Sequence, residues 1–268
     1  MTAEILALAN HKGGVTRTTS SVNLAAGLAQ SQWRTLLVDC DAQGNATSMF
    51  FPDDGSRGEL QLDLYDVVGA NVPASKAIRE TRISGLDLLP ATLAVARLDQ
   101  ELVTMHRREE QLRRHLAPVL DDYDIIVLDL APNLGALVIA ALCASSSLIV
   151  PTDASRWGRR GVGMFLEWAQ ALRDADVLTA DLLGVLLTKY EPQTVVSRDV
   201  LADLQQSGLP LFNTHIPKRT AAERMVNTAT VIGDPDADDD LTYAYARFTV
   251  EVIERVREAQ ERRGRHRG

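Results

Sequence analysis

The stretch His11-Lys12-Gly13-Gly14-Val15-Thr16-Arg17-Thr18-Thr19 is the clearest indication of the fold, because its flanks are those of a phosphate-binding loop. Residues 5–9 before it are apolar over the length of a buried parallel strand. Residues 18–32 after it can form a helix, with Val22, Ala25, Ala26 and Ala29 along one face. A strand, a glycine-containing turn and a helix, in this order, predict a loop that holds phosphate groups.

Glycines and hydroxyl groups give this loop its chemistry. The pair Gly13-Gly14 lets successive backbone N–H groups point into one concavity, and the N-terminus of the following helix attracts negative charge. A hydroxyl in the first helical turn can hold Mg²⁺, and Thr18 has that position. Arg17 precedes it and is the cation expected to reach the β- and γ-phosphates. The predicted nucleotide-binding residues of the loop are Gly13, Gly14, Val15, Thr16, Arg17, Thr18 and Thr19.

The loop departs from the general motif G-x-x-x-x-G-K-[ST] at three of its four fixed positions, where it has His11, Thr16 and Arg17. By itself, therefore, the stretch also fits an ordinary glycine-rich turn between a strand and a helix. If the position of Thr16 requires a positive φ, its β-branched side chain costs about 1 to 3 kcal/mol. Arg17 keeps the charge of the missing lysine, but a planar guanidinium does not replace a compact ammonium between two phosphates.

Carboxylates follow two other predicted strands. Residues 35–40 form an apolar run that carries Asp39 and is followed by Asp41, and residues 123–128 form another that is followed by Asp129. Open α/β sheets bind ligands at the carboxyl ends of their strands, so we expect Asp39 and Asp41 to face the same crevice as the loop. Asp129 is expected to approach Mg²⁺ directly or through water, together with Thr18 and Asp41.

The remaining chain alternates between strand and helix patterns. Further strands are expected at residues 86–90, 147–151, 182–188 and 212–216, and helices at 62–68, 93–120, 164–173, 200–206 and 243–263. This alternation predicts an α/β fold with a mostly parallel, twisted sheet flanked by helices on both faces. No linker or internal repeat divides it, so we expect residues 1–268 to form one domain. Residues 262–268 are expected to be a frayed basic tail.

Composition narrows the class of protein. The chain has 268 residues, 46% of them hydrophobic, which is enough for a large core. It has no apolar run long enough to span a membrane and no signal-peptide pattern, so a cytoplasmic protein is expected. Cys40 and Cys143 cannot form a disulfide framework or a four-ligand zinc site. The net charge of −8 hides a basic C-terminal end, where arginines gather between residues 255 and 267.

The run K-G-G-V-x-x-T-T from Lys12 to Thr19 resembles the deviant Walker A loop of the ParA/Soj/MinD family of partition and positioning ATPases. Residues 36–47 resemble the second motif of that family, and residues 125–135 resemble its Walker B segment. Residues 148–151, 184–189 and 215–219 also resemble ParA segments. The similarity covers nearly the whole chain, in the order that the family requires.

This resemblance implies a P-loop ATPase that binds ATP or ADP with Mg²⁺. Lys12 stands at the place of the signature lysine, which reaches across a two-fold homodimer to the partner's phosphates when ATP binds. Asp41 would orient the attacking water, so the expected catalytic residues are Lys12, Asp41 and Arg17. Pro217 and Lys218, in the segment at 215–219, are expected to contact the nucleotide.

The resemblance also implies partners in plasmid or chromosome segregation. ParA dimers bind DNA without sequence preference, and a ParB-like centromere-binding protein stimulates hydrolysis, so a nucleoid-associated protein is expected. The candidate phosphate contacts are Lys218, Arg219, Arg224, Arg247 and Arg255. MinD-like members end in an amphipathic membrane helix, but the last residues here lack Trp, Phe and Leu, so membrane binding is not expected.

Two alternatives remain beside a weakly active ATPase. A nucleotide-binding or DNA-scaffolding protein of the same fold that has lost hydrolysis is favoured by Thr16 and Arg17. A nitrogenase-reductase-like iron–sulfur protein would need cluster cysteines at the dimer face, and Cys40 and Cys143 do not resemble that pattern.

Overall fold

The computed structural model describes residues 3–52, 61–219, 231–232, 234 and 236–267. Within these residues, seven strands form one sheet in the order β3-β4-β2-β5-β1-β6-β7. All neighbouring strands are parallel except β3 and β4, which are antiparallel. The strands are β1 (Glu4–Leu8), β2 (Thr35–Cys40), β3 (Arg79–Glu80), β4 (Leu86–Leu89), β5 (Ile125–Leu130), β6 (Ser147–Asp153) and β7 (Asp181–Thr188).

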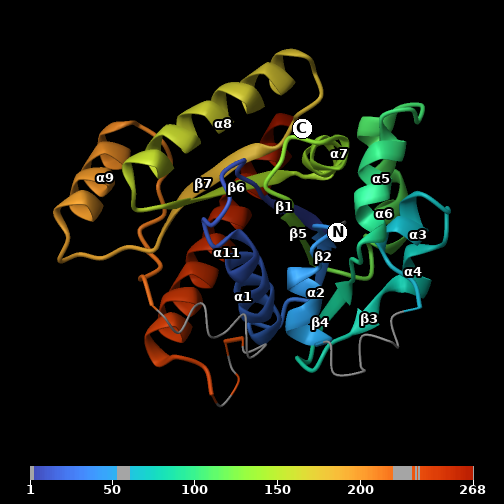
Figure 1. Cartoon of the computed structure of the whole chain (residues 1–268), viewed down its shortest axis with the longest axis horizontal. Helices are drawn as coiled ribbons and strands as arrows, with labels where there is room; N and C mark the ends of the chain where they lie inside the picture. Colours follow the sequence, from blue (N-terminus) through green and yellow to red (C-terminus); the bar gives the residue numbers. More distant parts are fainter. Residues whose placement is uncertain (1–2, 53–60, 220–230, 233, 235, 268) are drawn as a thin grey trace.

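Helices cover both faces of this sheet (Figure 1). One face carries α1 (Arg17–Gln30), α2 (Asn45–Phe50) and α11 (Asp239–Arg267). The other carries α3 (Leu64–Val68), α5 (Ala94–Leu102), α6 (Gln111–Leu116), α7 (Ala136–Ala144) and α8 (Arg156–Asp174). Among the described residues, the remaining helices are α4 (Ala74–Ala77), α9 (Val195–Gln206) and two short 3₁₀ turns, η2 (Arg108–Glu110) and η3 (Ala117–Val119). The predicted α/β class is confirmed.

The central strands β1, β2 and β5 are mostly apolar because each one contributes to two cores. Along β1, Ile5 and Ala7 pack into the core under α5 to α8, whereas Leu6 and Leu8 pack into the core under α1 and α11. Strand residues alternate in direction, so a strand buried on both faces has no polar side. The apolar run at residues 35–40 therefore predicted β2 with its correct bounds.

Two predicted elements are wrong. The expected helix at residues 93–120 is broken, because Arg107 has a left-handed backbone (φ 50°) and α5 and α6 lie on either side of it. The expected strand at 212–216 does not form. The residues on either side of it make isolated bridges, Leu211 with Val185 and Pro217 with Tyr190. The backbone N–H groups of residues 213 and 214 donate to the carboxylate of Glu251 at 2.8 and 3.1 Å instead of to a strand.

The last helix is longer than the sequence predicts. α11 begins at Asp239 and continues to Arg267, past the predicted helix end at residue 263, and the frayed tail expected at residues 262–268 stays a prediction. Arg263 explains part of the extension, because its guanidinium pairs with Glu4 of β1 at 2.7 Å and donates to the Ser146 carbonyl. That residues 1–268 form one domain stays a prediction.

Candidate functional site

The loop between β1 and α1 has two residues in the left-handed conformation that favours glycine, but only one of them is a glycine. Gly14 has φ 77° and Thr16 has φ 55° with ψ 32°, so both lie in the left-handed region. The condition set for Thr16 is therefore met, and a threonine occupies a position that favours glycine, at a cost of about 1 to 3 kcal/mol. The Thr16 hydroxyl donates to the Val15 carbonyl at 2.7 Å, which turns this side chain back onto the loop.

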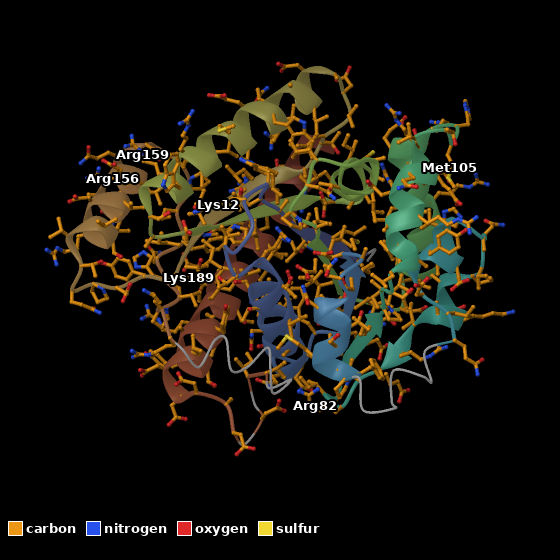
Figure 2. The ribbon with its side chains drawn as sticks, viewed as in Figure 1. Lys12, Arg82, Met105, Arg156, Arg159 and Lys189 are labelled. Atoms are coloured by element: carbon orange, nitrogen blue, oxygen red, sulfur yellow. The ribbon has the colours of Figure 1, made fainter. Side chains whose placement is uncertain are left out.

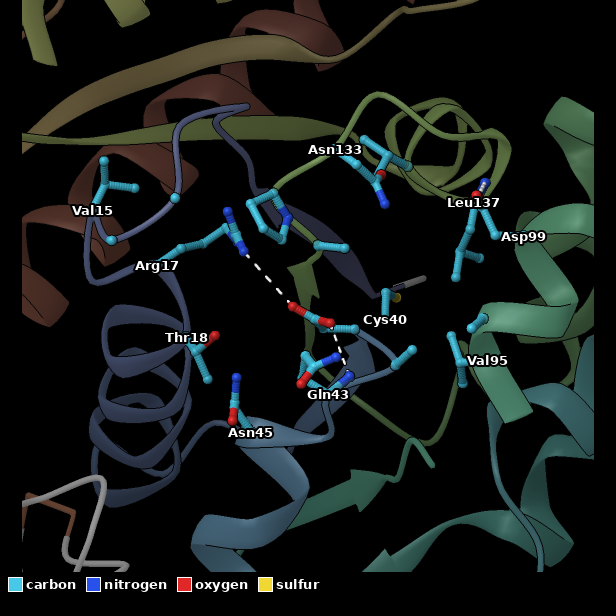
Figure 3. Close-up of a pocket in the computed structure, with 18 of the residues that line it drawn as sticks. Val15, Arg17, Thr18, Cys40, Gln43, Asn45, Val95, Asp99, Asn133 and Leu137 are labelled. Atoms are coloured by element: carbon cyan, nitrogen blue, oxygen red, sulfur yellow. Dashed lines mark hydrogen bonds and ion pairs between the residues drawn. The ribbon is translucent and has the colours of Figure 1, made fainter. Parts of the chain in front are cut away.

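The loop forms one wall of a cavity of about 570 Å³ at the carboxyl ends of β1, β2 and β5. Figure 3 shows Val15, Arg17 and Thr18 on one side and Val95, Asp99 and Leu137 on the other. All seven predicted loop residues, Gly13 to Thr19, line this cavity. The end of β2 contributes Cys40, Asp41, Gln43 and Asn45, and the segment after β5 contributes Ala131, Pro132 and Asn133. The structure therefore brings the loop and Asp41 together.

Arg17 is the buried cation of the cavity, with 7% of its surface exposed. Its Nη1 donates to the Asn10 carbonyl at 3.1 Å. Its Nη2 lies 3.9 Å from Asp41 Oδ2, the ion pair drawn as a dashed line in Figure 3. Its Nε lies 3.9 Å from Asp129 Oδ1. Both carboxylates expected at the metal thus lie beside this guanidinium. Arg17 Nε and Asp129 Oδ2 are buried and have no hydrogen-bond partner.

Asp129 is fully buried in β5, and the Ser21 hydroxyl of α1 donates to its Oδ1 at 2.9 Å. Burial raises the pKa of Asp129, and the charge of Arg17 opposes that shift. Among the described residues, no three His, Cys, Asp or Glu side chains are arranged to hold a metal ion by themselves. The Thr18 hydroxyl and the unpartnered oxygen of Asp129 nevertheless fit Mg²⁺, which prefers oxygen ligands and takes the rest from phosphates and water.

Asp39 does not face the cavity, contrary to expectation. It is fully buried and accepts hydrogen bonds from the backbone and hydroxyl of Thr47 and from the backbone of Asp41. Burial raises the pKa of Asp39 to about 7, and the neighbouring charge of Asp129, its register partner on β5, adds to the shift. Asp39 therefore holds the turn after β2 through these hydrogen bonds. Of the two carboxylates Asp39 and Asp41, Asp41 is the one that lines the cavity.

Lys12 points away from the cavity. Its ammonium donates to both oxygens of Asp153 at 2.8 and 2.7 Å and to the Ser155 hydroxyl at 3.2 Å. Figure 2 shows Lys12 near the first part of α8, and a Cβ added at Gly161 of that helix would lie 3.8 Å from the Lys12 side chain. Within this chain, then, Lys12 is held by the end of β6 and does not line the cavity.

The structure does not bring the segment at 215–219 to the cavity. Pro217 bridges to Tyr190, and Lys218 pairs with Glu191 at 2.9 Å, on the far side of β7. Neither residue is among the described residues that line the cavity. The predicted nucleotide contacts of Pro217 and Lys218 therefore have no support in this geometry.

The predicted DNA contacts are in different surroundings. Arg255 has partners within the chain: its guanidinium donates to the carbonyls of Leu183 and Leu211 and to Glu251, and lies 4.1 Å from the centre of the Phe212 ring. Arg219 pairs with Asp240. Arg247 is exposed and lies 5.9 Å from the centre of the Tyr243 ring. Arg224 lies outside the described residues.

Residues that sequence reasoning missed form the far wall of the cavity. Asp99 of α5 accepts a hydrogen bond from the Leu137 backbone at 2.8 Å, at the start of α7. A side chain at Gly135 would collide with that carboxylate, which explains the glycine. Asn133 accepts from the backbone of Gly135 at 3.0 Å. The Asn-Leu-Gly sequence after β5 was a visible turn signal, but the contact with Asp99 depends on the folded chain.

A strand, a glycine loop with left-handed residues and a helix, with carboxylates at the ends of the adjacent strands, define the class of P-loop nucleotide-binding proteins. Residues 3–183 match the model of the AAA_31 family, described as an AAA domain, and the chain belongs to this family. Within the described residues, no helix is long and apolar enough to cross a membrane.

The relatives and solved structures agree with this assignment. The chain is 36% identical over 205 residues to the sporulation initiation inhibitor protein Soj of Bacillus subtilis, covering 76% of this chain and 79% of that protein. It is 30% identical to the chromosome partitioning protein ParA of Caulobacter vibrioides, covering 96% of each chain. A structure of cobyrinic acid a,c-diamide synthase from Mycobacterium smegmatis with bound ADP and magnesium has a TM-score of 0.81, 30% identity, and coverage of 95% and 96%. The chain is a relative of the Soj and ParA partition ATPases.

Proposed function

We propose that this chain is an ATP-dependent partition protein that binds ATP or ADP with Mg²⁺ in the cavity beside residues 13–19. The observation that supports this most directly is that all seven loop residues line one cavity with Asp41. The relatives named Soj and ParA, and the ADP and magnesium in the similar mycobacterial structure, support the same ligand. We place the protein in the cytoplasm, associated with the nucleoid.

The residues of the cavity have separate roles in this proposal. The backbone N–H groups of Gly13 to Thr19 bind the phosphates, and Thr18, Asp129 and Asp41 would hold Mg²⁺, which supplies positive charge to the transferred phosphoryl group. Asp41 orients the attacking water. It is well placed for this, because Asp41 Oδ1 accepts from the Gln43 backbone at 3.0 Å, which fixes the carboxylate at the cavity wall.

The proposed dimer would use Lys12. In our proposal Lys12 exchanges Asp153 and Ser155 for the phosphates of a partner subunit when ATP is bound. Two polyphosphates that face each other need cations from both sides, so ATP would favour the dimer and hydrolysis would release it. In the free chain, the Asp153 contact keeps Lys12 from its role.

We propose that the dimer binds DNA non-specifically and that a ParB-like partner stimulates hydrolysis. With the Arg255 guanidinium bound to backbone carbonyls and Glu251, the described candidates for phosphate contacts are Lys218, Arg219 and Arg247. Lys218 and Arg219 each pair with a surface carboxylate, so each would exchange that partner for a phosphate. Exposed ion pairs are worth about 1 kcal/mol or less, which makes such an exchange inexpensive.

The test is equilibrium binding of ATP and ADP beside a hydrolysis assay, with and without DNA. Gly14→Val should abolish binding, because a β-branched residue at φ 77° distorts the phosphate loop. Gly208→Val is the matched control, since Gly208 has φ 72° and open space around it but does not line the cavity. Equal binding by both variants would remove the loop from the nucleotide site.

A second function has its own support, namely a nucleotide-binding or DNA-scaffolding protein that does not hydrolyse ATP. The left-handed Thr16 and the contacts of Arg17 with Asp41 and Asp129 favour it, because both alter the loop that positions the γ-phosphate. The hydrolysis arm of the same experiment separates the two functions. Binding of ATP and DNA without any turnover would identify the scaffold.

A further inference from the structure

Arg17 lies where a metal ion would meet its protein ligands. Its guanidinium is 3.9 Å from a carboxylate oxygen of Asp41 and 3.9 Å from one of Asp129. These two side chains, with Thr18, are the ones that fit Mg²⁺. The cation that the general motif directs toward the phosphates is therefore directed, in this chain, toward the metal ligands.

The position of the guanidinium is fixed by a second buried contact. Arg17 Nη1 donates to the Asn10 carbonyl, and the Asn10 side chain donates to the Pro151 carbonyl at 2.8 Å. Asn10 is 2% exposed, so this support belongs to the core at the ends of β1 and β6. The planar fork of an arginine can hold the Asn10 carbonyl while it faces two carboxylates, whereas a lysine ammonium is a single compact charge.

The local charge balance explains why the arrangement is favourable. Asp41 and Asp129 are both buried, and a buried carboxylate needs a compensating cation or strong hydrogen bonds. Arg17 provides that cation from within the chain. A divalent ion that enters the same space meets the positive charge of Arg17 at close range, and the repulsion between like charges is strong where water is excluded.

We propose that Arg17 and Mg²⁺ compete for Asp41 and Asp129, so that Mg²⁺ adds little to the affinity of this chain for nucleotide. The inference rests on the proposed function, because it assumes that the cavity binds ADP or ATP. Arg17 would thereby determine how far nucleotide binding depends on Mg²⁺.

The experiment is titration calorimetry of ADP in excess MgCl₂ and in excess EDTA, with the wild-type chain and with Arg17→Lys. For the wild type, the two affinities should agree within about threefold. For Arg17→Lys, Mg²⁺ should strengthen ADP binding by about tenfold or more, because the two carboxylates become available to the metal. Arg159→Lys, which alters an exposed pair with Asp203 away from the cavity, should behave as the wild type.

A second variant, Arg17→Met, covers the case in which Arg17→Lys does not fold, since methionine has a similar length without charge. For this variant the ratio of ADP affinities in MgCl₂ and in EDTA should also rise to about tenfold or more. Its unfolding temperature shows whether the variant is folded. Wild-type binding that already increases tenfold or more with Mg²⁺ would overturn the competition, whatever the variants do. Failure of the wild type to bind ADP or ATP in either buffer would overturn the proposed function together with this inference.

Discussion

Arg17 is buried and Arg255 is partly buried, and the sequence predicts a ligand contact for both, but their surroundings differ. Arg255 makes four hydrogen bonds of 2.7 to 3.3 Å and lies over the Phe212 ring. Arg17 makes one at 3.1 Å, lies 3.9 Å from two carboxylates, and has a buried Nε without a partner. Incomplete bonding of a buried charge thus separates an arginine available to a ligand from one that holds the fold.

The largest expected effect concerns Arg255. Arg255→Met should lower the free energy of unfolding by about 2 to 4 kcal/mol, because three backbone carbonyls lose a charged donor and Glu251 loses its cation. Urea denaturation measures this change. Arg247→Met, an exposed arginine on the same helix, is the control and should change stability by less than about 0.5 kcal/mol. An equal loss in both variants would show that bonding does not distinguish these arginines.

The second effect concerns the rate of hydrolysis. Thr16→Gly with Arg17→Lys should raise the ATPase rate by about tenfold or more, since each 1.4 kcal/mol or so of barrier is about tenfold. The first change removes the backbone strain at Thr16, and the second removes the guanidinium beside Asp41 and Asp129. Asp176→Gly with Arg159→Lys is the matched control, because Asp176 has φ 57° in a region away from the cavity. A flat rate in the first double variant would mean that another step limits turnover.

The third effect concerns DNA binding by Lys218 and Arg219, which each pair with a surface carboxylate in the free chain. In the presence of ATP, Lys218→Ala with Arg219→Ala should weaken binding to all sequences alike. It should also flatten the dependence of log K on log[salt] by about 0.9 per lost phosphate contact. Arg97→Ala with Arg107→Ala removes two exposed cations that also pair with glutamates, and should change neither quantity. An unchanged salt slope in the first pair would exclude this surface.

The smallest effect concerns His215, which lies beside the Glu251 network. Burial lowers the pKa of His215, and Glu251 opposes that shift. The folded chain therefore binds fewer protons at this site than the unfolded chain, so the contribution of His215 is present above about pH 6.5 and is lost as the pH falls. His215→Gln should flatten this decline in the free energy of unfolding, measured by urea denaturation at several pH values. The exposed His106→Gln should leave the decline unchanged.

The sequence predicted what depends on local pattern. The apolar run of β2 and the glycine turn at residues 13–14 carry their own signals, because burial on both faces and a left-handed backbone each restrict the residue types. The loop residues and Asp41 could therefore be placed at the cavity. The break at Arg107 had no such signal, since arginine is common within helices.

What the sequence did not predict depends on contacts between distant segments. Glu251 binds the backbone at residues 213 and 214 and so prevents a strand there. Asp153 holds Lys12 across more than half of the chain, and Asp99 reaches the start of α7. Arginine alone also does not reveal whether its partners are carbonyls, as at Arg255, or carboxylates, as at Arg17. Such partners are set by tertiary structure and leave no periodic trace in the sequence.

The packing of α11 on α1 also bears on the order in which the chain becomes functional during synthesis. Tyr245 of α11 bonds to Ser20 of α1, and Thr249 lies so close to Gly27 that a side chain there would collide. α1 leaves the ribosome about 10 to 40 s before α11, at roughly 5 to 20 residues per second. During that interval its apolar face lacks its final cover. The phosphate loop is thus attached to a helix that is complete long before its last packing partner is made.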